Sequence, residues 1–389
     1  MNLAKKIAGI KPSVTLAVTS QAKQMAGRGI RVINFAAGEP DFNTPLHVRT
    51  AAIQAINNGF TKYTPVSGAR ELKAAICDKL RRDNALNYQT EQIVVSCGAK
   101  HSLFNILQVL CQKGDQVIIA SPYWVSYPQM VKLAGARPII IPTKINNQFK
   151  MTGKQLASSI TSRTRAVILN SPANPTGSVY NREELAEIAR VVLRHNIYLI
   201  SDEIYEKIIY DKKRHISIAS LNKKVNKITI VVNGLSKAYS MTGWRIGYLA
   251  GPKELASAVA VLQSHSTSNP NSIAQKAALT ALNGKEEFIV KMQKEFSKRR
   301  NYLLKEIRKI DKISFSKPEG AFYLFCDISK TGRGSLNFSQ KLLEREKVAV
   351  VPGVAFGEDN YIRLSFATGM EDIKEGVNRL AKFISRIRP

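Results

Sequence analysis

A lysine and an arginine lie eight positions apart in a stretch of small residues, Ser236-Lys237-Ala238-Tyr239-Ser240-Met241-Thr242-Gly243-Trp244-Arg245. Two further polar motifs lie upstream, Asn174-Pro175-Thr176-Gly177 and Asp202-Glu203-Ile204-Tyr205. A lysine amine can form a Schiff base with an aldehyde, and an arginine can bind a phosphate. A carboxylate can pair with a ring nitrogen, while asparagine and tyrosine can donate to a phenolic oxygen. Together these groups supply what a protein needs to hold pyridoxal phosphate.

With these motifs the chain resembles the fold-type I aminotransferases, and among them the bacterial aspartate aminotransferases of the subgroup that often also uses prephenate. The resemblance extends from Lys11-Pro12-Ser13 to the C-terminus. It implies transfer of an amino group between L-aspartate and 2-oxoglutarate in two half-reactions of a ping-pong route. It also leaves prephenate open as a second oxo substrate, which would give arogenate.

Lys237 is predicted to be the Schiff-base lysine and the catalytic residue. An amine that forms an imine must lose its proton, which burial or neighbouring cations favour. The freed amine would then carry the proton between the α-carbon of the substrate and the C4′ carbon of the cofactor. Any single lysine of this chain is more simply explained as a surface residue. Only the setting of Lys237, after Ser236 and eight residues before Arg245, distinguishes it.

Three upstream residues are predicted to contact the cofactor ring. Asp202 would pair with the pyridinium nitrogen, which makes the ring an electron sink. Asn174 and Tyr205 would donate to the phenolate oxygen. The alternatives are an Asp202 that caps a helix and an Asn-Pro-Thr-Gly segment that is simply a tight turn.

The phosphate of the cofactor is predicted to bind at a helix start and at an arginine. The candidates are the side chains of Ser236 and Arg245 and the backbone amides of Gly98, Ala99 and Lys100. By resemblance, Trp124 stacks on the cofactor ring, although a tryptophan in the core is an equal alternative from the sequence alone. Tyr63 matches a tyrosine that reaches the phosphate of the neighbouring subunit, which implies a homodimer with shared active sites.

Arg363, within Ile362-Arg363-Leu364-Ser365, is predicted to bind the α-carboxylate of the substrate, because a charge in an apolar strand is costly unless it is paired. Gly38 would let the backbone approach the same carboxylate. Trp124 and Asn174 are expected to contact the substrate as well. By resemblance, the distal carboxylate is bound by three further residues, Lys100, Ser264 from the partner subunit and Lys11 of the N-terminal arm.

Seven short apolar runs predict the strands that position these motifs, at residues 93–96, 117–120, 138–141, 166–169, 198–201, 229–232 and 246–249. Such runs are typical of strands buried on both faces of a mostly parallel sheet. Polar motifs follow five of them, and ligands of open α/β sheets bind beyond the carboxyl ends of the strands. The sequence therefore predicts an α/β fold with the site at one edge of the sheet, which the resemblance identifies as the seven-stranded fold-type I large domain.

Between the strands of the large sheet a helix is predicted over 182–194, with Asn181 as its N-cap. The C-terminal part has a different pattern. After residue 285 follow a long charged helix over 286–310 and a last amphipathic helix over 371–387. Strand-like pieces at 321–325, 348–351 and 361–365 indicate a smaller α+β domain. With the resemblance, we predict an arm (1–14), a small domain (15–47 and 285–389) and a large cofactor-binding domain (48–284).

The chain carries 58 Lys and Arg against 29 Asp and Glu, a formal net charge of +29. Such a charge is compatible with a nucleic-acid-binding protein, which is the alternative from a different class. The basic residues are spread along the chain, so we favour a basic surface on an enzyme that binds amino acids and 2-oxo acids, with no nucleic-acid partner. Within the fold, a lyase or an aminotransferase for aromatic or other amino acids stays open.

Four cysteines are scattered without CxxC spacing, so neither a zinc site nor a disulfide scaffold is predicted. No apolar run approaches the roughly 18–20 residues that span a bilayer, and no membrane partner is expected. The first acidic residue is Glu39, a composition found in transit peptides. Because the resemblance already begins at Lys11, we expect this segment to belong to the fold and the protein to be cytoplasmic.

Overall fold

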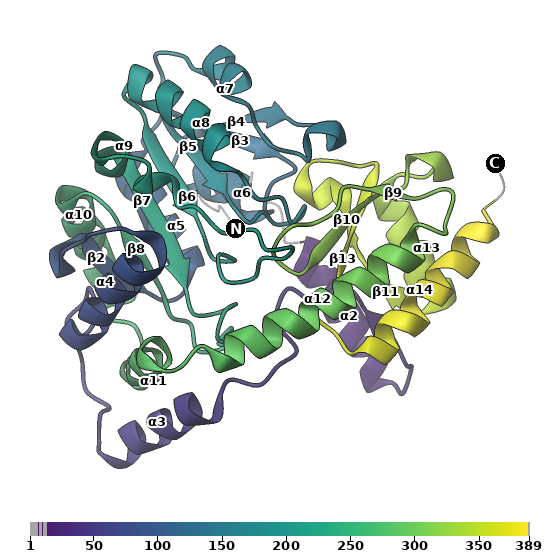
Figure 1. Cartoon of the computed structure of the whole chain (residues 1–389), viewed down its shortest axis with the longest axis horizontal. Coiled ribbons are helices and arrows are strands. Elements are labelled where there is room, and N and C mark those ends of the chain that lie inside the picture. The colour runs from purple at the N-terminus through teal and green to yellow at the C-terminus, as the bar shows by residue number, and fades with distance from the viewer. Residues whose placement is uncertain (1–6, 8–9, 11–13, 388–389) are drawn as a thin grey trace, which may run out of the picture.

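The larger part of the molecule is built around a seven-stranded sheet (Figure 1). The computed structural model describes residues 7, 10 and 14–387. The strand order of the sheet is β2 (Ile93–Ser96), β8 (Gly247–Ala250), β7 (Thr229–Gly234), β6 (Tyr198–Asp202), β5 (Thr164–Asn170), β3 (Gln116–Ser121) and β4 (Arg137–Pro142). Only β8 runs against its neighbours in this sheet. The carboxyl ends of β2, β3, β5, β6 and β7 therefore share one edge, and all seven predicted runs are confirmed as strands.

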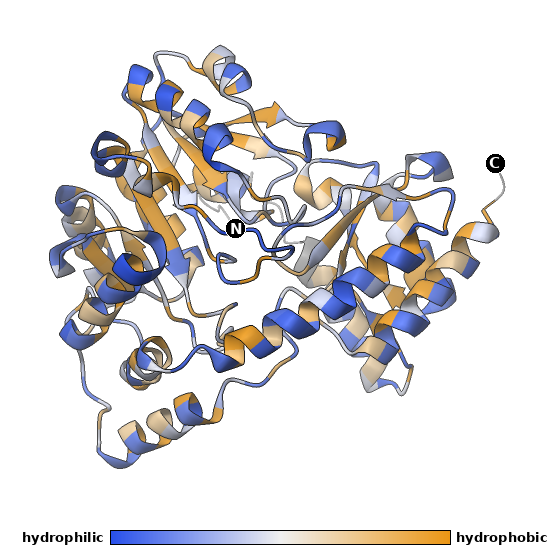
Figure 2. Ribbon diagram, in the orientation of Figure 1, coloured by the Kyte–Doolittle hydropathy of each residue, from blue (hydrophilic) through white to orange (hydrophobic). Residues whose placement is uncertain are grey.

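Helices cover both faces of this sheet, because alternate side chains of each strand point to opposite sides. Val117 and Ile119 pack in one core with helices α5 (Ala99–Leu110), α6 (Ser126–Leu133) and α10 (Lys253–Ser264). Ile118, between them, packs in another core with α7 (Gly153–Ser159), α8 (Arg182–His195) and α9 (Lys223–Ile228). A third core joins β2 and β8 to α3 (Leu46–Asn57), α4 (Arg70–Asn84) and α11 (Ser272–Asn283). Figure 2 shows the resulting apolar strands between helices of mixed hydropathy.

A smaller antiparallel sheet lies beside the large one, in the order β12 (Val351–Pro352), β13 (Tyr361–Ser365), β10 (Tyr323–Asp327) and β9 (Ser314–Phe315). It packs against α12 (Glu287–Ile307), α13 (Ser335–Glu346) and α14 (Met370–Ser385), and α12 extends from it toward the large sheet (Figure 1). The predicted run 348–351 is divided between two sheets, because β11 (Val348–Ala349) pairs instead with β1 (Ile33–Asn34).

The N-terminal segment packs with the C-terminal part of the chain. Ile33 and Phe35 belong to the same core as Phe296 of α12 and Leu364 of β13. Helix α2 (Val14–Gly27) contributes Ala22 to a neighbouring cluster that includes Val351. The division into an arm and two domains that is proposed from the sequence stays a prediction. Among the described helices, none combines the length and the apolar character that crossing a membrane requires.

Local sequence signals explain how two helices of the large part begin. Asn181 accepts a hydrogen bond from the backbone of Glu184, and the two residues form a capping box at the start of α8. Helix α5 begins at Ala99, directly after Gly98, whose φ of 89° lies in the region that favours glycine. The N-terminal amides of α5 therefore lie at the edge where the polar motifs gather.

Candidate active site

A cavity of about 290 Å³ lies at the carboxyl edge of the large sheet, where that sheet meets the smaller one. It brings together most of the predicted site residues, from the end of β6, from loops of the large sheet, from the N-terminal segment and from β13. These residues are Gly38, Ala99, Lys100, Trp124, Asn174, Asp202, Tyr205, Ser236, Lys237, Arg245 and Arg363. Segments that lie far apart in the sequence thus converge as the strand-end motifs predict.

Lys237 is partly buried, and its Nζ donates to the backbone oxygen of Gly38 at 2.6 Å. Burial lowers the pKa of this amine to about 8, and while Glu39 opposes the shift, nearby cations reinforce it. A substantial fraction of the amine is therefore neutral near physiological pH. A neutral amine in a cavity can act as a nucleophile and can accept a proton.

Asp202 ends β6 and is 4% exposed. Its Oδ2 accepts a hydrogen bond from the Tyr127 hydroxyl at 2.6 Å, and its Oδ1 accepts one from the backbone of Ile204. Burial raises the pKa of the carboxyl to about 6, although both hydrogen bonds act in the opposite direction. A buried carboxylate with this pKa is suited to pair with a protonated ring nitrogen.

Arg363 is buried, at 2% exposure, and no acidic side chain in the described part of the chain forms an ion pair with it. Its Nη1 donates to Asn174 Oδ1 at 3.0 Å and its Nη2 to the backbone oxygen of Ala36 at 3.1 Å. Nε is buried and has no hydrogen-bond partner among the residues that the structure describes. An uncompensated charge inside a protein is costly, so the arrangement favours an anionic ligand beside this guanidinium.

Gly98 and Arg245 meet at the start of α5. Arg245 donates to the backbone oxygens of Thr242 at 2.8 Å and Cys97 at 3.2 Å. A Cβ at position 98 would overlap the end of this guanidinium and come within 2.9 Å of its central carbon. The glycine thus lets a cation lie against the N-terminal amides of α5, and the two together suit a phosphate.

Trp124 and Lys100 form the wall next to Asp202. The Lys100 Nζ lies 4.9 Å from the centre of the Trp124 ring, and that ring packs edge-on against Tyr127 at 5.3 Å. Burial and then Arg245 lower the pKa of Lys100. With Lys237, Arg245 and Arg363, the cavity lining holds four cationic side chains against the single carboxylate of Asp202. Such a lining suits a ligand with several negative charges.

Some predicted residues lie elsewhere. Tyr63 is 89% exposed and Ser264 is exposed, and neither lines this cavity. Both were predicted to act on a partner subunit, so one chain does not test them. Lys11 lies outside the described residues. Among the described residues, a Cβ at Gly38 would meet only Tyr323 Oη, at 3.7 Å, so no close contact with them requires a glycine there.

Two tyrosines of the cavity were missed by the sequence reasoning, Tyr127 and Tyr323. Tyr127 lies three residues after Trp124, near the start of α6, and its closeness in sequence to a predicted site residue was the available signal. Tyr323 belongs to the predicted strand-like piece 321–325, to which no site residue was assigned. Its hydroxyl lies 2.9 Å from that of Tyr205. No local sequence pattern predicts this contact.

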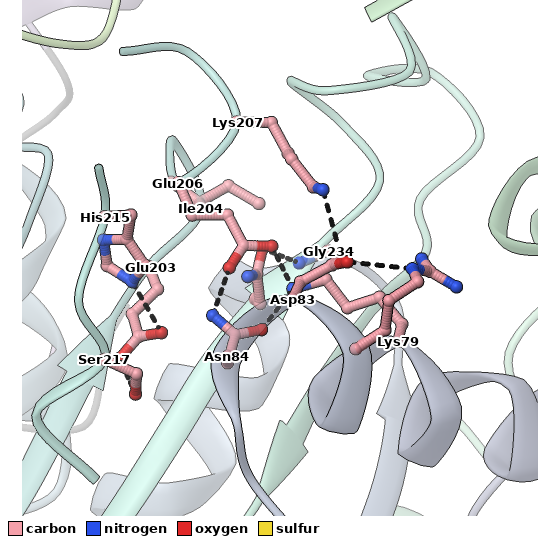
Figure 3. A network of polar contacts seen from close by, with 12 residues as sticks. Lys79, Asp83, Asn84, Glu203, Ile204, Glu206, Lys207, His215, Ser217 and Gly234 are labelled. Carbon is pink, nitrogen blue, oxygen red and sulfur yellow. Dashed lines mark hydrogen bonds and ion pairs between the residues drawn. The ribbon is translucent and has the colours of Figure 1, made fainter. Parts of the chain in front are cut away.

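A polar network joins the segment that follows β6 to α4 (Figure 3). Glu203 accepts hydrogen bonds from Ser217 and Ser201 and lies 2.9 Å from His215, while Glu206 pairs with Lys79 and Asn84. Glu203, Glu206 and His215 are close enough to share a metal ion. The carboxylate oxygens, however, already have donors within the protein, so the network is explained by its role in holding this segment.

The chain was compared with known proteins and structures. The family model described as aminotransferase class I and II matches residues 30–380. An aspartate aminotransferase of Bacillus subtilis (strain 168) is 46% identical over 391 residues, which cover 99% of this chain and all of the relative. The bifunctional aspartate aminotransferase and glutamate/aspartate-prephenate aminotransferase of Petunia hybrida is 46% identical, over 100% of this chain and 84% of the relative.

Solved structures agree with these relatives. The aspartate aminotransferase from Rhizobium meliloti superposes with a TM-score of 0.96 at 41% identity, with 100% of both chains covered. The aspartate aminotransferase from Thermus thermophilus with maleate gives a TM-score of 0.95 at 40% identity, over 98% of this chain and 100% of the other. The likeness covers the whole architecture, including both sheets.

Proposed function

The chain belongs to the class I and II aminotransferase family, and on this premise we propose that it transfers the amino group of L-aspartate to 2-oxoglutarate with pyridoxal 5′-phosphate as cofactor. The products are oxaloacetate and L-glutamate. The observation that carries the proposal is the buried Arg363, which has no carboxylate partner in the described chain and shares the cavity with Lys237. The relatives named as aspartate aminotransferases support the choice of substrate.

The residues of the cavity fit this cofactor. Lys237 offers the amine that can hold its aldehyde, and Asp202 offers a buried carboxylate for its ring nitrogen. Ser236, Arg245 and the start of α5 would hold the phosphate, beside a Gly98 that leaves room for the guanidinium. When bound, pyridoxal phosphate supplies an aromatic ring that accepts the electrons released when the bond between the α-carbon and its hydrogen breaks.

Arg363 orients the substrate. A planar guanidinium can bind the α-carboxylate with two parallel hydrogen bonds, and this fixes the direction of the bond from the α-carbon to its hydrogen. The contacts of Arg363 to Asn174 and Ala36 hold the guanidinium in place before the substrate arrives. The burial cost of the charge is then offset by the substrate rather than by the protein.

Lys237 moves the proton. Its neutral amine can accept the α-proton of the substrate at Nζ, and the protonated amine can then donate a proton to a different atom of the reacting molecules. One group thus acts first as a general base and then as a general acid. The low pKa of the amine suits both directions of transfer, because neither protonation state is strongly favoured near pH 8.

We further propose that Lys100, Ser264 of a partner subunit and Lys11 bind the distal carboxylate in a homodimer with shared sites. Lys100 lines the cavity of its own chain. The exposure of Tyr63 and Ser264 supports the idea that they serve the other subunit. A mixture of an inactive Tyr63 variant and an inactive Lys237 variant tests this, because hybrid dimers would regain one intact site. No regain under conditions that exchange subunits would count against sharing.

Prephenate is a second oxo substrate to consider, because relatives at similar identity are named as aspartate/prephenate aminotransferases. A cytoplasmic location is likewise a proposal. The four cysteines are free, which agrees with a reducing compartment.

The experiment is a visible absorption spectrum of the protein loaded with pyridoxal phosphate. L-aspartate is expected to shift the band of the bound cofactor, and 2-oxoglutarate, or prephenate in a parallel sample, to restore it. Lys237→Ala should show neither the original band nor this cycle, whereas Lys276→Ala, a lysine that lies over Phe60 outside the cavity, should behave like the native chain. A band that responds to aromatic amino acids but not to aspartate would make the aromatic alternative correct. Failure to bind the cofactor at all would overturn the proposal.

A further inference from the structure

Tyr323 contacts two predicted site residues at once. It lies on β10, next to the strand that carries Arg363, and it is 1% exposed. Its hydroxyl is 2.9 Å from the hydroxyl of Tyr205, and the guanidinium carbon of Arg363 lies 4.1 Å from the centre of its ring. One side chain therefore joins the residue predicted to face the cofactor oxygen to the residue predicted to face the substrate.

The direction of the bond between the two hydroxyls matters, because each hydroxyl has one proton. If Tyr205 donated to Tyr323, its proton would not be available to a ligand. If Tyr323 donates, the proton of Tyr205 is free to point into the cavity, which both side chains line. In the described part of the chain neither hydroxyl has another hydrogen-bond partner, so the protein offers no competing acceptor.

The charge of Arg363 favours donation by Tyr323. Burial raises the pKa of Tyr323, and Arg363 is the strongest influence that lowers it. Burial and then Tyr323 raise the pKa of Tyr205 well above its ordinary value, and Arg363 opposes this shift too. The guanidinium lies 4.1 Å from the centre of the Tyr323 ring, and a cation so close to a phenol favours loss of its proton, which makes the Tyr323 hydroxyl a good donor.

We propose that Tyr323 is a positioning residue with two functions: its hydroxyl directs the proton of Tyr205 into the cavity, and its ring supports the guanidinium of Arg363. The inference rests on the proposed function, in which Tyr205 donates to the phenolic oxygen of the cofactor and Arg363 binds a carboxylate. It links the cofactor side of the site to the substrate side through a residue that belongs to the smaller sheet.

The hydroxyl function is tested by Tyr323→Phe, with the pH midpoint of the bound cofactor's absorption change as the readout. A hydrogen bond that is received makes a hydroxyl a stronger donor. Without it, Tyr205 withdraws less charge from the phenolic oxygen, which then holds the neighbouring proton of the bound cofactor more tightly. We expect the midpoint to rise by about 0.3 pH units. Five titratable or charged groups face Tyr205 in the described structure, Tyr127, Asp202, Lys237, Tyr323 and Arg363, and Tyr323→Phe keeps the other four.

A double-mutant cycle shows whether the effect passes through Tyr205. In a Tyr205→Phe background, Tyr323→Phe should leave the midpoint unchanged. An equal shift in both backgrounds, or no shift in the native background, would overturn the hydroxyl function. A merely structural loss would instead lower the melting temperature and leave the midpoint in place.

The ring function is tested by the affinity of the cofactor-loaded protein for maleate, a dicarboxylate without an amino group, measured by calorimetry. Tyr323→Phe keeps the ring under Arg363 and should bind maleate as the native chain does. Tyr323→Leu removes the ring, and loss of the contact between cation and ring should weaken binding about fivefold. Equal affinities for the Phe and Leu variants would overturn the ring function.

Tyr210 supplies the matched control. It is also buried, its hydroxyl donates to the backbone oxygen of Ala321 at 2.6 Å, and Arg300 lies 4.5 Å from its ring centre. Tyr210→Phe and Tyr210→Leu should change neither the midpoint nor maleate affinity. If the native protein failed to bind cofactor or maleate, the proposed function would be overturned. If the native protein bound both and the Tyr323 variants had the native midpoint and the native maleate affinity, only this inference would be overturned.

Discussion

Arg363 Nη1 donates to Asn174 Oδ1 at 3.0 Å, although Arg363 lies on β13 of the smaller sheet and Asn174 in the loop after β5 of the large sheet. The bond holds the two sheets together at the cavity. It also joins a residue predicted for the substrate carboxylate to one predicted for the cofactor oxygen. Binding of either ligand is therefore expected to depend on how the two sheets meet.

Replacing Arg363 by lysine should impair the use of dicarboxylic substrates. Lysine keeps the charge but loses the planar pair of donors, so we expect kcat/KM for aspartate to fall about 100-fold, or about 2.7 kcal/mol. Steady-state kinetics with aspartate and with glutamate as the amino donor measures the change in kcat/KM. Arg308→Lys is the control, because that arginine lies over Phe315 away from the cavity. Similar kinetics for the two variants would show that Arg363 does not bind substrate.

Replacing Gly98 by alanine should weaken cofactor binding. Both Gly98 and Gly59 have positive φ, at 89° and 68°, so alanine at either site should cost about 1 kcal/mol of stability. Only at Gly98 would the new Cβ meet Arg245, while nothing lies within 4 Å at Gly59. Titration of the apoprotein with pyridoxal phosphate should give a dissociation constant raised about tenfold or more for Gly98→Ala alone. An equal change in both variants would point to backbone strain instead.

The amine of Lys237 should become reactive at a lower pH than an ordinary lysine. In the apoprotein, the rate of its labelling by an amine-directed reagent is expected to be half-maximal near pH 8, because only the neutral amine reacts and its pKa is lowered to about 8. Glu39 favours the charged form, so Glu39→Gln should shift the midpoint further down. Glu371→Gln, at an exposed site on α14, is the control. Peptide mass spectrometry measures the labelling. A midpoint that Glu39→Gln leaves unchanged would contradict the assignment of Glu39 as a charge that raises the pKa of Lys237.

The pair of Lys79 and Glu206 should matter for stability. Burial alone would raise the pKa of Glu206, but Lys79 and His215 lower it to about 2. Lys79→Met leaves a buried carboxylate unpaired, which should cost about 3 kcal/mol at pH 7 in urea unfolding. The loss should shrink as the pH falls from the ordinary pKa of a glutamate toward 2, because the stabilising charge on Glu206 is present above that range and disappears through it.

Two comparisons test this stability effect. Adding Glu206→Gln to Lys79→Met should recover part of the loss, since no unpaired charge remains. Arg81→Met breaks an exposed pair with Asp78, whose side chains are 61% and 66% exposed, and should cost about 0.5 kcal/mol or less. A Lys79→Met loss no larger than that of Arg81→Met would refute the buried-pair account.

Local sequence was enough for the strands of the large sheet, whereas several residues of the cavity lining, Trp124 and Lys100 among them, were predicted from the family resemblance. The apolar runs predicted all seven strands of the large sheet, and Asn181 with Glu184 marked the start of α8. These signals are local, because burial on both faces selects apolar runs and capping involves residues three apart. The run 348–351 was correctly read as extended, but its division between two sheets depends on partners far away in the chain.

The sequence by itself determined which residues follow which strands, and therefore that Asn174, Asp202 and Lys237 would meet at one edge. Only the tertiary structure decided that Arg363 is buried without a carboxylate partner in the described chain and that Tyr323 lies between it and Tyr205. The physical reason is that strand direction and period follow from neighbouring residues, whereas the pairing and the pKa of a buried group depend on atoms brought close from distant segments.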